Sequence, residues 1–246
     1  MLEAVLIGAV RGGTSIVFAA VGETISERSG VINLGVEGSM LAGALTAYAV
    51  GIETGSPWIG AGAGVAAGVL LALVHAFMVI RREANQIAVG LAVFFLGLGG
   101  TSLFGQGYVS QGVQPFTAHA VPGLSDLPFL GPILFDHDPL TYLSFLIVPA
   151  AWFFLMRTGT GLRIRAAGER PEVLETMGTS TARVRWLAIA IGGGLAGLGG
   201  AQLATAFART WSEDMVAGRG FIAVALVIFA GWNPLFTIAG AYLFSG

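Results

Sequence analysis

Apolar runs long enough to cross a lipid bilayer recur along the whole chain. A membrane-spanning helix needs about 20 mostly apolar residues, and this chain of 246 residues is 55% hydrophobic and only 11% charged. Soluble domains carry about 25% charged residues, so the pattern predicts an all-α, polytopic bundle of transmembrane helices in a single domain over residues 1–246. The expected spans are residues 2–21, 34–51 extended by 30–33, 58–80, 86–104, 140–156 and 186–207, followed by half-length runs at 220–231 and 235–246.

The composition excludes several kinds of chemistry. With no cysteine, the chain has no disulfide, thiolate metal site or cysteine nucleophile. Its histidines, His75, His119 and His137, show no metal-ligand spacing. All twelve basic residues are arginine, whereas a phosphate-binding P-loop needs a lysine. We therefore expect no metal, cofactor or catalysis in this chain, no nucleic acid partner, and any ATP to bind a separate polypeptide.

The arginines set the expected orientation, because cytoplasmic loops collect basic residues. Arg81 and Arg82 end one span, and residues 157–185 hold six further arginines. Residues 105–139 hold none. The two basic segments are therefore expected to face the cytoplasm, and the arginine-free loop to face outward.

Two apolar regions are irregular. Residues 2–21 are interrupted by Arg-Gly-Gly at 11–13, so this run is either a full span, with residue 1 outside, or a re-entrant segment, with residue 1 inside. The half-length runs meet at Trp-Asn-Pro, residues 232–234, which predicts a kinked span or a broken helix. Because the sequence stops within an apolar run, we expect the natural chain to be longer.

One expected span, residues 58–80, carries Gly60, Gly64 and Gly68 at four-residue intervals. Small residues so spaced let helix backbones approach closely in a membrane. The repeat therefore predicts close helix packing, with a lipid-facing surface as the alternative.

A polar stretch at residues 22–40 stands out from the apolar pattern with four charges and four glycines. Ionisable groups at membrane depth usually face a cavity, a partner or the interface, and glycines permit a broken helix. The stretch is either a turn between two spans or a helix break beside a substrate path. We expect its first half, 23–28, to be structural or interfacial and its second half, 33–38, to be the break.

The basic loop contains a segment, residues 168–178, that predicts a short helix. Pro171 suits the first turn, Glu172 complements the positive helix end, and Gly178 suits the stop. Val173, Leu174 and Met177 are expected to share one face. Such a short helix is marginal alone, so we expect it to dock on a protein partner; the alternative is a helix lying on the inner membrane surface, which its acidic residues disfavour.

Three motifs stand out in the sequence: residues 22–38 (GETISERSGVINLGVEG), 161–172 (GLRIRAAGERPE), and 217–223 (AGRGFIA) running into 232–235 (WNPL). Together they resemble the permease subunits of bacterial ABC importers for nucleosides, within the group that includes ribose and branched-chain amino acid permeases. The likeness covers nearly the whole chain in order, although it is less specific for the substrate. One departure is Asn85, which stands before Gln86 where relatives often have an acidic residue.

The resemblance implies a multi-pass subunit of the bacterial cytoplasmic (inner) membrane, in contact with lipid. Its implied partners are a second permease subunit, two cytosolic ATP-binding subunits and an extracytoplasmic substrate-binding lipoprotein. It also implies that relatives continue past residue 246 and that the short cytoplasmic helix is the coupling helix that docks on the ATPase. The coupling residues expected from it are Glu169, Arg170, Pro171, Glu172, Val173, Leu174, Glu175, Met177 and Gly178.

Four polar residues are candidates for the substrate pathway: Asn33, Glu37, Gln86 and Asn233. Amides can donate to and accept from base and ribose edges. The alternative is structural: Asn33 and Asn233 cap broken helices, and Glu37 pairs with Arg28 or with a neighbouring helix. The competing function is a secondary transporter or channel driven by an ion gradient, with Glu23, Glu27 or Glu37 as a proton site.

Overall fold

The computed structural model describes residues 2–245. Five helical segments in it are long and apolar enough to cross a membrane: residues 2–28, 57–81, 86–108, 139–157 and 181–207. The expected all-α bundle is confirmed for the described part of the chain. Its elements are α1 (Leu2–Arg28), α2 (Val36–Thr54), α3 (Pro57–Ala76) continued by η1 (Phe77–Arg81), α4 (Gln86–Gly105), η2 (Gln106–Tyr108), β1 (His119–Ala120), α5 (Leu130–Leu134), β2 (Asp136–His137), α6 (Pro139–Arg157), α7 (Gly159–Glu169), α8 (Pro171–Thr176), α9 (Thr181–Gln202) continued by η3 (Leu203–Phe207), α10 (Arg219–Phe229) and α11 (Pro234–Ser245).

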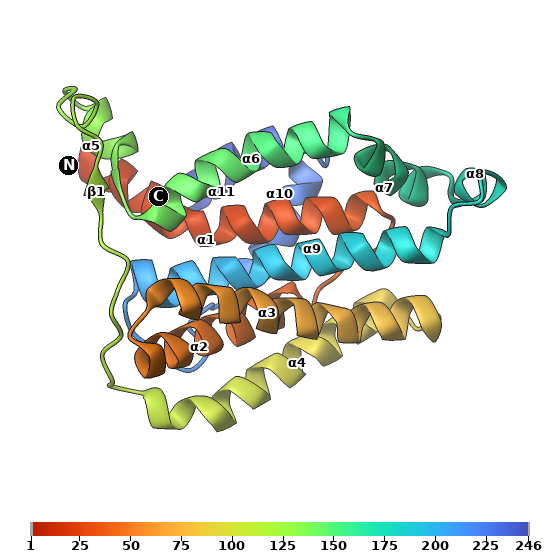
Figure 1. The fold of residues 1–246 in the computed structure, drawn as a ribbon, viewed down its shortest axis with the longest axis horizontal. Helices are drawn as coiled ribbons and strands as arrows, with labels where there is room; N and C mark the ends of the chain where they lie inside the picture. The colour runs from red at the N-terminus through yellow and green to blue at the C-terminus, as the bar shows by residue number, and fades with distance from the viewer. Residues whose placement is uncertain (1, 246) are drawn as a thin grey trace.

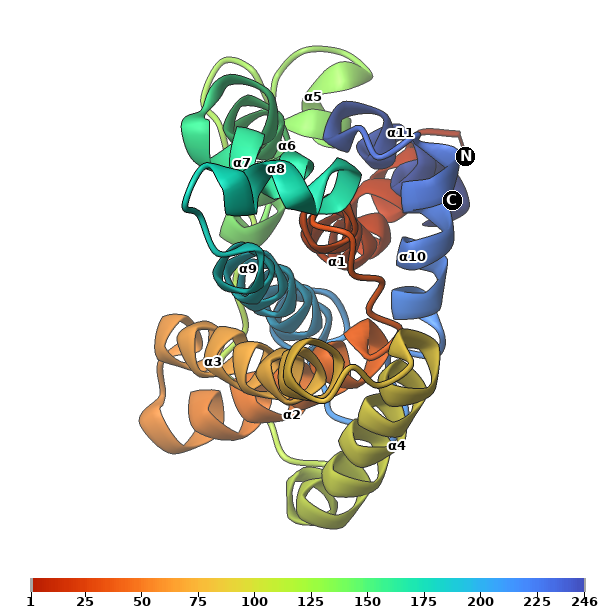
Figure 2. The ribbon, with the colours of Figure 1, turned by 90° about the vertical axis from the view of Figure 1, so that its right-hand side faces the viewer.

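Helix α9 runs through the middle of the bundle, between α1 and the pair α2 and α3 (Figures 1 and 2). Glycines bring these backbones into contact. A Cβ added at Gly64 of α3 would lie 2.7 Å from Gly43 O of α2, and one added at Gly22 of α1 would lie 2.6 Å from Gly192 O of α9. The close packing predicted from the glycine repeat of α3 is therefore confirmed.

Helix α1 is continuous over 27 residues, so the first apolar run is a full span. It begins at the end of the molecule that carries β1 and α5 and ends near α7 (Figure 1). Near its start, Arg11 Nη2 donates to Asp136 O at 3.1 Å. Leu2 therefore lies on the same side as the arginine-free loop, and α7 and α8 lie on the opposite side, as the arginine distribution predicted.

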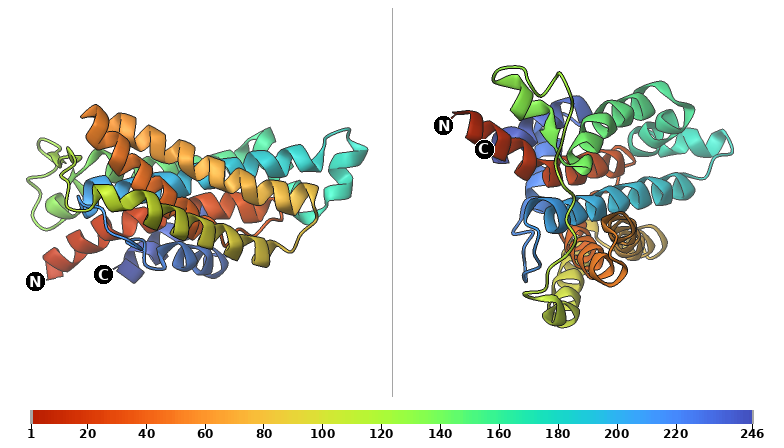
Figure 3. Two further views of the ribbon diagram at one scale, coloured as in Figure 1. Left: turned by 90° about the horizontal axis from the view of Figure 1, so that it is seen from below. Right: turned by 60° about the vertical axis from the view of Figure 1, so that its left-hand side comes forward.

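The half-length runs form two helices, α10 and α11, that fold back on each other beside α1. At the start of α10, Arg219 Nη1 donates to Gly12 O at 2.7 Å. At the end of α11, Ser245 Oγ lies 2.7 Å from where a Cβ on Gly12 would sit. Gly231 (φ 60°) and Trp232 (φ 56°) reverse the chain between the helices. The runs are thus a broken helix and not a kinked span, and the end of α11 lies beside the first half of α1 (Figure 3).

Candidate functional site

The break between α1 and α2 is held by buried polar contacts. Asn33 is 3% exposed; its N–H donates to Glu23 Oε1 at 2.7 Å, and its Oδ1 accepts from Gly35 N–H at 3.0 Å. Non-helical backbone at membrane depth persists only where the protein or a water-filled cavity satisfies its polar groups. These contacts favour the structural role expected for Asn33, and they give Glu23 a structural role as well.

Gln86 joins this break to the start of α4. Its Oε1 accepts from Ile32 N–H at 2.8 Å. Gln86 is half-buried, so part of its side chain is available to a solute while it also binds the backbone of the break. It borders a cavity of about 360 Å³ that is lined by Ile32, Ala84, Asn85, Gln86 and Ile87.

Asn85, the residue that departs from the family pattern, caps α4. Its Oδ1 accepts from Ile87 N–H at 3.0 Å and from Ala88 N–H at 3.1 Å. Asparagine and aspartate are equally favoured at this position of a helix. An acidic residue could make the same two bonds, so the departure does not disturb the local fold.

Glu37 anchors the start of α10. Its Oε1 accepts from Gly218 N–H at 2.7 Å and its Oε2 from Gly220 N–H at 2.6 Å, while the residue is only 1% exposed. A carboxylate suits this place because the first N–H groups of a helix are unpaired and carry partial positive charge. Of the two structural partners expected for Glu37, the neighbouring helix is the one observed. Arg28, the other expected partner, lies 3.7 Å from Glu169 instead.

Asn233 lies in the turn between α10 and α11, apart from the other three pathway candidates. Its Oδ1 accepts from Leu235 N–H at 3.1 Å, which caps α11. The neighbouring Trp232 Nε1 donates to Glu27 Oε2 at 2.6 Å and so fixes the turn to the end of α1. The structure thus brings Asn33 and Gln86 together around Ile32, places Glu37 against α10, and leaves Asn233 separate.

The cytoplasmic segment predicted as one helix is divided between two. Glu169 ends α7, Arg170 lies between the helices, and α8 begins at Pro171. The expected shared apolar face is wrong, because Leu174 is 3% exposed and packs into the main core, whereas Val173 is 40% and Met177 75% exposed. A core contact therefore anchors α8 through Leu174, which leaves Val173 and Met177 facing away from the bundle.

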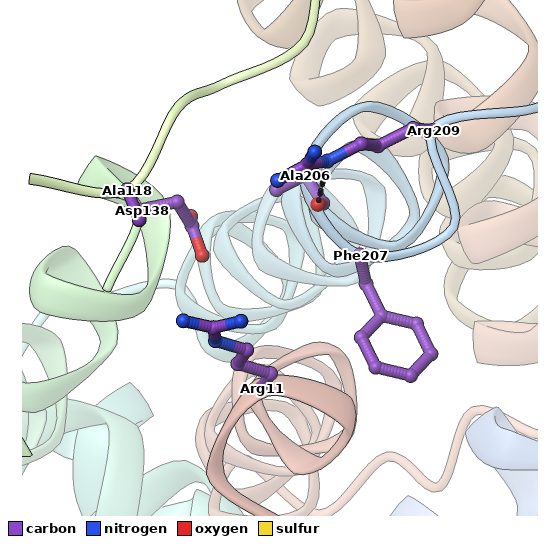
Figure 4. A pocket seen from close by; sticks show the side chains of 6 residues that line it. All are labelled: Arg11, Ala118, Asp138, Ala206, Phe207 and Arg209. Atoms are coloured by element: carbon purple, nitrogen blue, oxygen red, sulfur yellow. Dashed lines mark hydrogen bonds between the residues drawn. The ribbon is translucent and has the colours of Figure 1, made fainter. Parts of the chain in front are cut away.

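An outer cavity of about 330 Å³ opens between α1, η3 and the start of α6, and sequence reasoning did not identify it. Figure 4 shows the guanidinium group of Arg11 and the carboxylate of Asp138 pointing toward each other across it, with Arg209 on another wall. The feature of the sequence that could have pointed to this cavity was Arg11, a charged residue within an apolar run. The cavity is lined by Arg11, Ala118, Asp138, Ala206, Phe207 and Arg209.

Arg219 is a second residue that sequence reasoning left without a role. Besides its bond to Gly12 O, its guanidinium lies 5.7 Å from the ring centre of Phe207. It begins α10 beside the Glu37 anchor. The feature of the sequence that could have pointed to a role for Arg219 was its charge at the edge of an apolar run, within the motif 217–223.

Within residues 2–245, no group of three or more His, Asp or Glu side chains could hold a metal ion. The site is therefore described by hydrogen-bonding groups and cavities alone.

Comparison with known proteins places these features in a family. A family model described as "Branched-chain amino acid transport system / permease component" matches residues 5–246. The chain is 46% identical to "Putative glucose ABC transporter permease protein TsgC13" of Haloferax volcanii, over 96% of this chain and 73% of the relative. It is 37% identical to the guanosine ABC transporter permease protein NupQ of Bacillus subtilis and 32% identical to the nucleoside ABC transporter permease protein NupC of Lactococcus lactis, in each case over 94% of this chain and 76% of the relative. No solved structure matches the chain.

Proposed function

The chain belongs to the family of permease components described for the branched-chain amino acid transport system, and from this premise we propose that it carries a nucleoside. Its role as a multi-pass ABC transporter permease of the cytoplasmic membrane follows from the family and its relatives. The observation that carries the substrate proposal is that two relatives named for guanosine and for nucleosides each align over 94% of this chain. Glucose is the second candidate, because the relative at 46% identity is named for it.

The chain itself performs no covalent chemistry in this proposal. It pairs with a second permease subunit, and an extracytoplasmic lipoprotein delivers the substrate to the pair. Two cytosolic subunits bind and hydrolyse ATP. The substrate passes between the permeases as they alternate between outward-open and inward-open states.

Helix α8 is the proposed contact with the ATPase. Val173 and Met177 project from the bundle, and the acidic residues Glu172 and Glu175 are exposed beside them. An exposed apolar pair on an anchored helix is suited to a groove in a protein partner. Exposed acidic side chains do not suit a membrane surface, which attracts basic ones.

Transport by the complete importer in proteoliposomes tests the substrate proposal. Uptake of radiolabelled guanosine, adenosine, uridine and glucose is measured with and without ATP. We expect nucleoside uptake that requires ATP and is competed by unlabelled nucleoside. Glucose uptake without nucleoside uptake would establish the second candidate. Uptake that persists without ATP but collapses with a protonophore would instead favour the ion-gradient transporter.

A further inference from the structure

The guanidinium group of Arg185, on α9, joins two elements of the cytoplasmic side. Its Nε donates to Ser29 O, just after α1, and its Nη2 donates to Ala167 O in the last turn of α7, both at 3.1 Å. Arginine presents its donors in a fixed planar fork, so it can hold two acceptors at a set spacing. One side chain therefore fixes the end of α1 relative to the end of α7.

The two elements also touch through glycine. Gly30 has a φ of 88°, and a Cβ added to it would lie 3.1 Å from Gly168 Cα and 3.3 Å from Arg185 Nη2. A Cβ on Gly168 would collide with Arg28 O. The end of α7 is thus seated directly on the backbone that leads into the helix break.

This contact lies between two regions of proposed function. On one side, α7 leads within two residues to α8, the proposed ATPase contact. On the other side, the chain reaches Asn33, the centre of the break, four residues after Ser29. From the break the chain enters α2, where Glu37 holds the start of α10.

Next to this contact, part of α8 is separated from the break by open space. A cavity of about 530 Å³ lies between Pro171 and Glu175 of α8 and Val31 of the break, and Arg185 and Gln86 also line it. Side chains of α8 therefore do not fill the gap to the break. The exposed ion pair of Arg28 and Glu169, at 3.7 Å, adds little, because such pairs are worth about 0–1 kcal/mol.

We propose that Arg185 is a positioning residue that transmits displacement of α7 and α8 to the break between α1 and α2. The inference rests on the proposed docking of α8 on an ATPase. Arg185 touches neither substrate nor ATP in this scheme. Its removal should separate ATP hydrolysis from transport and leave assembly intact.

The test compares R185Q with R183Q in the complete importer, reconstituted in proteoliposomes. Arg183 is on the same helix, is exposed, and loses the same charge when changed to glutamine. Uptake and ATP hydrolysis are measured in the same vesicles, together with copurification of the ATPase. Because coupling between sites is typically 5- to 150-fold, we expect R185Q to lower the substrate transported per ATP by about tenfold, with R183Q near wild type. R185K should recover part of the loss, because it keeps charge and donors but not the planar fork.

Two outcomes would overturn the inference. An unchanged ratio of transport to hydrolysis in R185Q shows that nothing passes through this contact. Equal losses of transport, hydrolysis and copurification show that Arg185 only holds the fold. The proposed function is judged separately by the wild-type importer: without ATP-dependent uptake there, the function itself fails.

Discussion

The carboxylate of Glu37 and the backbone N–H of Gly220 form a hydrogen bond of 2.6 Å between residues 183 positions apart. A Cβ on Gly220 would lie 2.7 Å from Glu37 Cα, so the two backbones are in contact as well. The bond joins the second half of the polar stretch 22–40 to the motif 217–223. Two segments that stand out separately in the sequence are therefore parts of one structural unit.

Removing this carboxylate should destabilise the subunit. Glu37→Ala leaves the buried N–H of Gly220 and the half-buried N–H of Gly218 without acceptors, and hydrogen bonds to charged groups contribute about 1.5–3 kcal/mol each. We expect a loss of about 3 kcal/mol for Glu37→Ala and a smaller loss for Glu37→Gln, which keeps one acceptor oxygen. Thermal unfolding of the detergent-solubilised protein measures both, with exposed Glu3→Gln as the control. A melting temperature for Glu37→Ala equal to that of the control would contradict the anchoring role.

The glycine packing of α9 predicts opposite effects for two alanine substitutions. A Cβ at Gly200 would overlap Met40 O, whereas one at Gly99 of α4 has nothing within 4 Å. Overpacking costs about 1–3 kcal/mol, and relief of glycine in a helix gains up to about 1 kcal/mol. Gly200→Ala should therefore lower the melting temperature and Gly99→Ala should hold or raise it. Equal shifts in the two variants would show that the backbones are not in contact at Gly200.

The outer loop should loosen in acid because of His137. Burial lowers the pKa of this imidazole, which is 0% exposed and whose Nε2 lies 2.7 Å from Ile133 O. The unfolded group has a pKa of about 6.5, so below that pH the unfolded loop binds the proton that the folded loop resists. The contribution of neutral His137 to the stability of the folded loop is thus fully present above about pH 6.5, and it is lost progressively as the pH falls below that value.

Hydrogen exchange of the peptide covering residues 119–138 measures this at pH 5 and pH 7.5, after correction for the intrinsic exchange rate. We expect faster corrected exchange at pH 5, and less difference in His137→Gln. Exposed His119→Gln is the matched control and should keep the difference. If His119→Gln alone removed it, His137 would not be the responsible group.

Two substitutions in α8 separate docking from folding. Val173→Asp puts a charge on the exposed face and should reduce copurification of the ATPase several-fold without lowering the melting temperature. Leu174→Ala removes a buried side chain, at a cost of about 2–5 kcal/mol, and should lower the melting temperature. Full copurification and ATP-dependent uptake in Val173→Asp would mean that the ATPase docks elsewhere.

Gln86 can be examined by comparing Gln86→Glu with Gln86→Ala in transport assays. Glutamate keeps the acceptor for Ile32 N–H but lacks the amide donor, and alanine lacks both. If Gln86 donates to the substrate, Gln86→Glu should raise KM for uptake by about tenfold or more, the cost of about 1.4 kcal/mol of lost contact. A wild-type KM in Gln86→Glu, with a loss in Gln86→Ala, would restrict Gln86 to holding the break.

Five of the expected spans and the family were predictable, because long apolar runs and short motifs are local signals. The expected span at residues 30–51 corresponds to α2, which is not among the helices apolar enough to cross a membrane by themselves. The fold-back of α10 and α11 was not predictable, because a proline between two short apolar runs fits both a kinked helix and a reversal of the chain. Leu174 was assigned to the wrong side because residues three and four apart share a face only in a regular helix, and α8 has six residues. The bond of Glu37 to α10 was not predictable, because it joins two segments that are far apart in the sequence. The cavity at Arg11 was not predictable either, because its walls come from three separate elements of the fold.

The glycine contacts of α9 limit how this molecule can move. At Gly22 and Gly192, and at Gly43 and Gly197, the backbones touch without side chains between them. A change of side-chain rotamer therefore cannot accommodate sliding of one helix along the other. The glycine-packed parts of α1, α2, α3 and α9 are therefore expected to move together as one rigid body, whereas the break between α1 and α2 lies outside these glycine contacts. Helix α6 meets α1 through side chains, as in the 3.5 Å hydrogen bond between the hydroxyl groups of Thr14 and Thr141. It is thus better suited to act as a lever, with α7 and α8 at its far end.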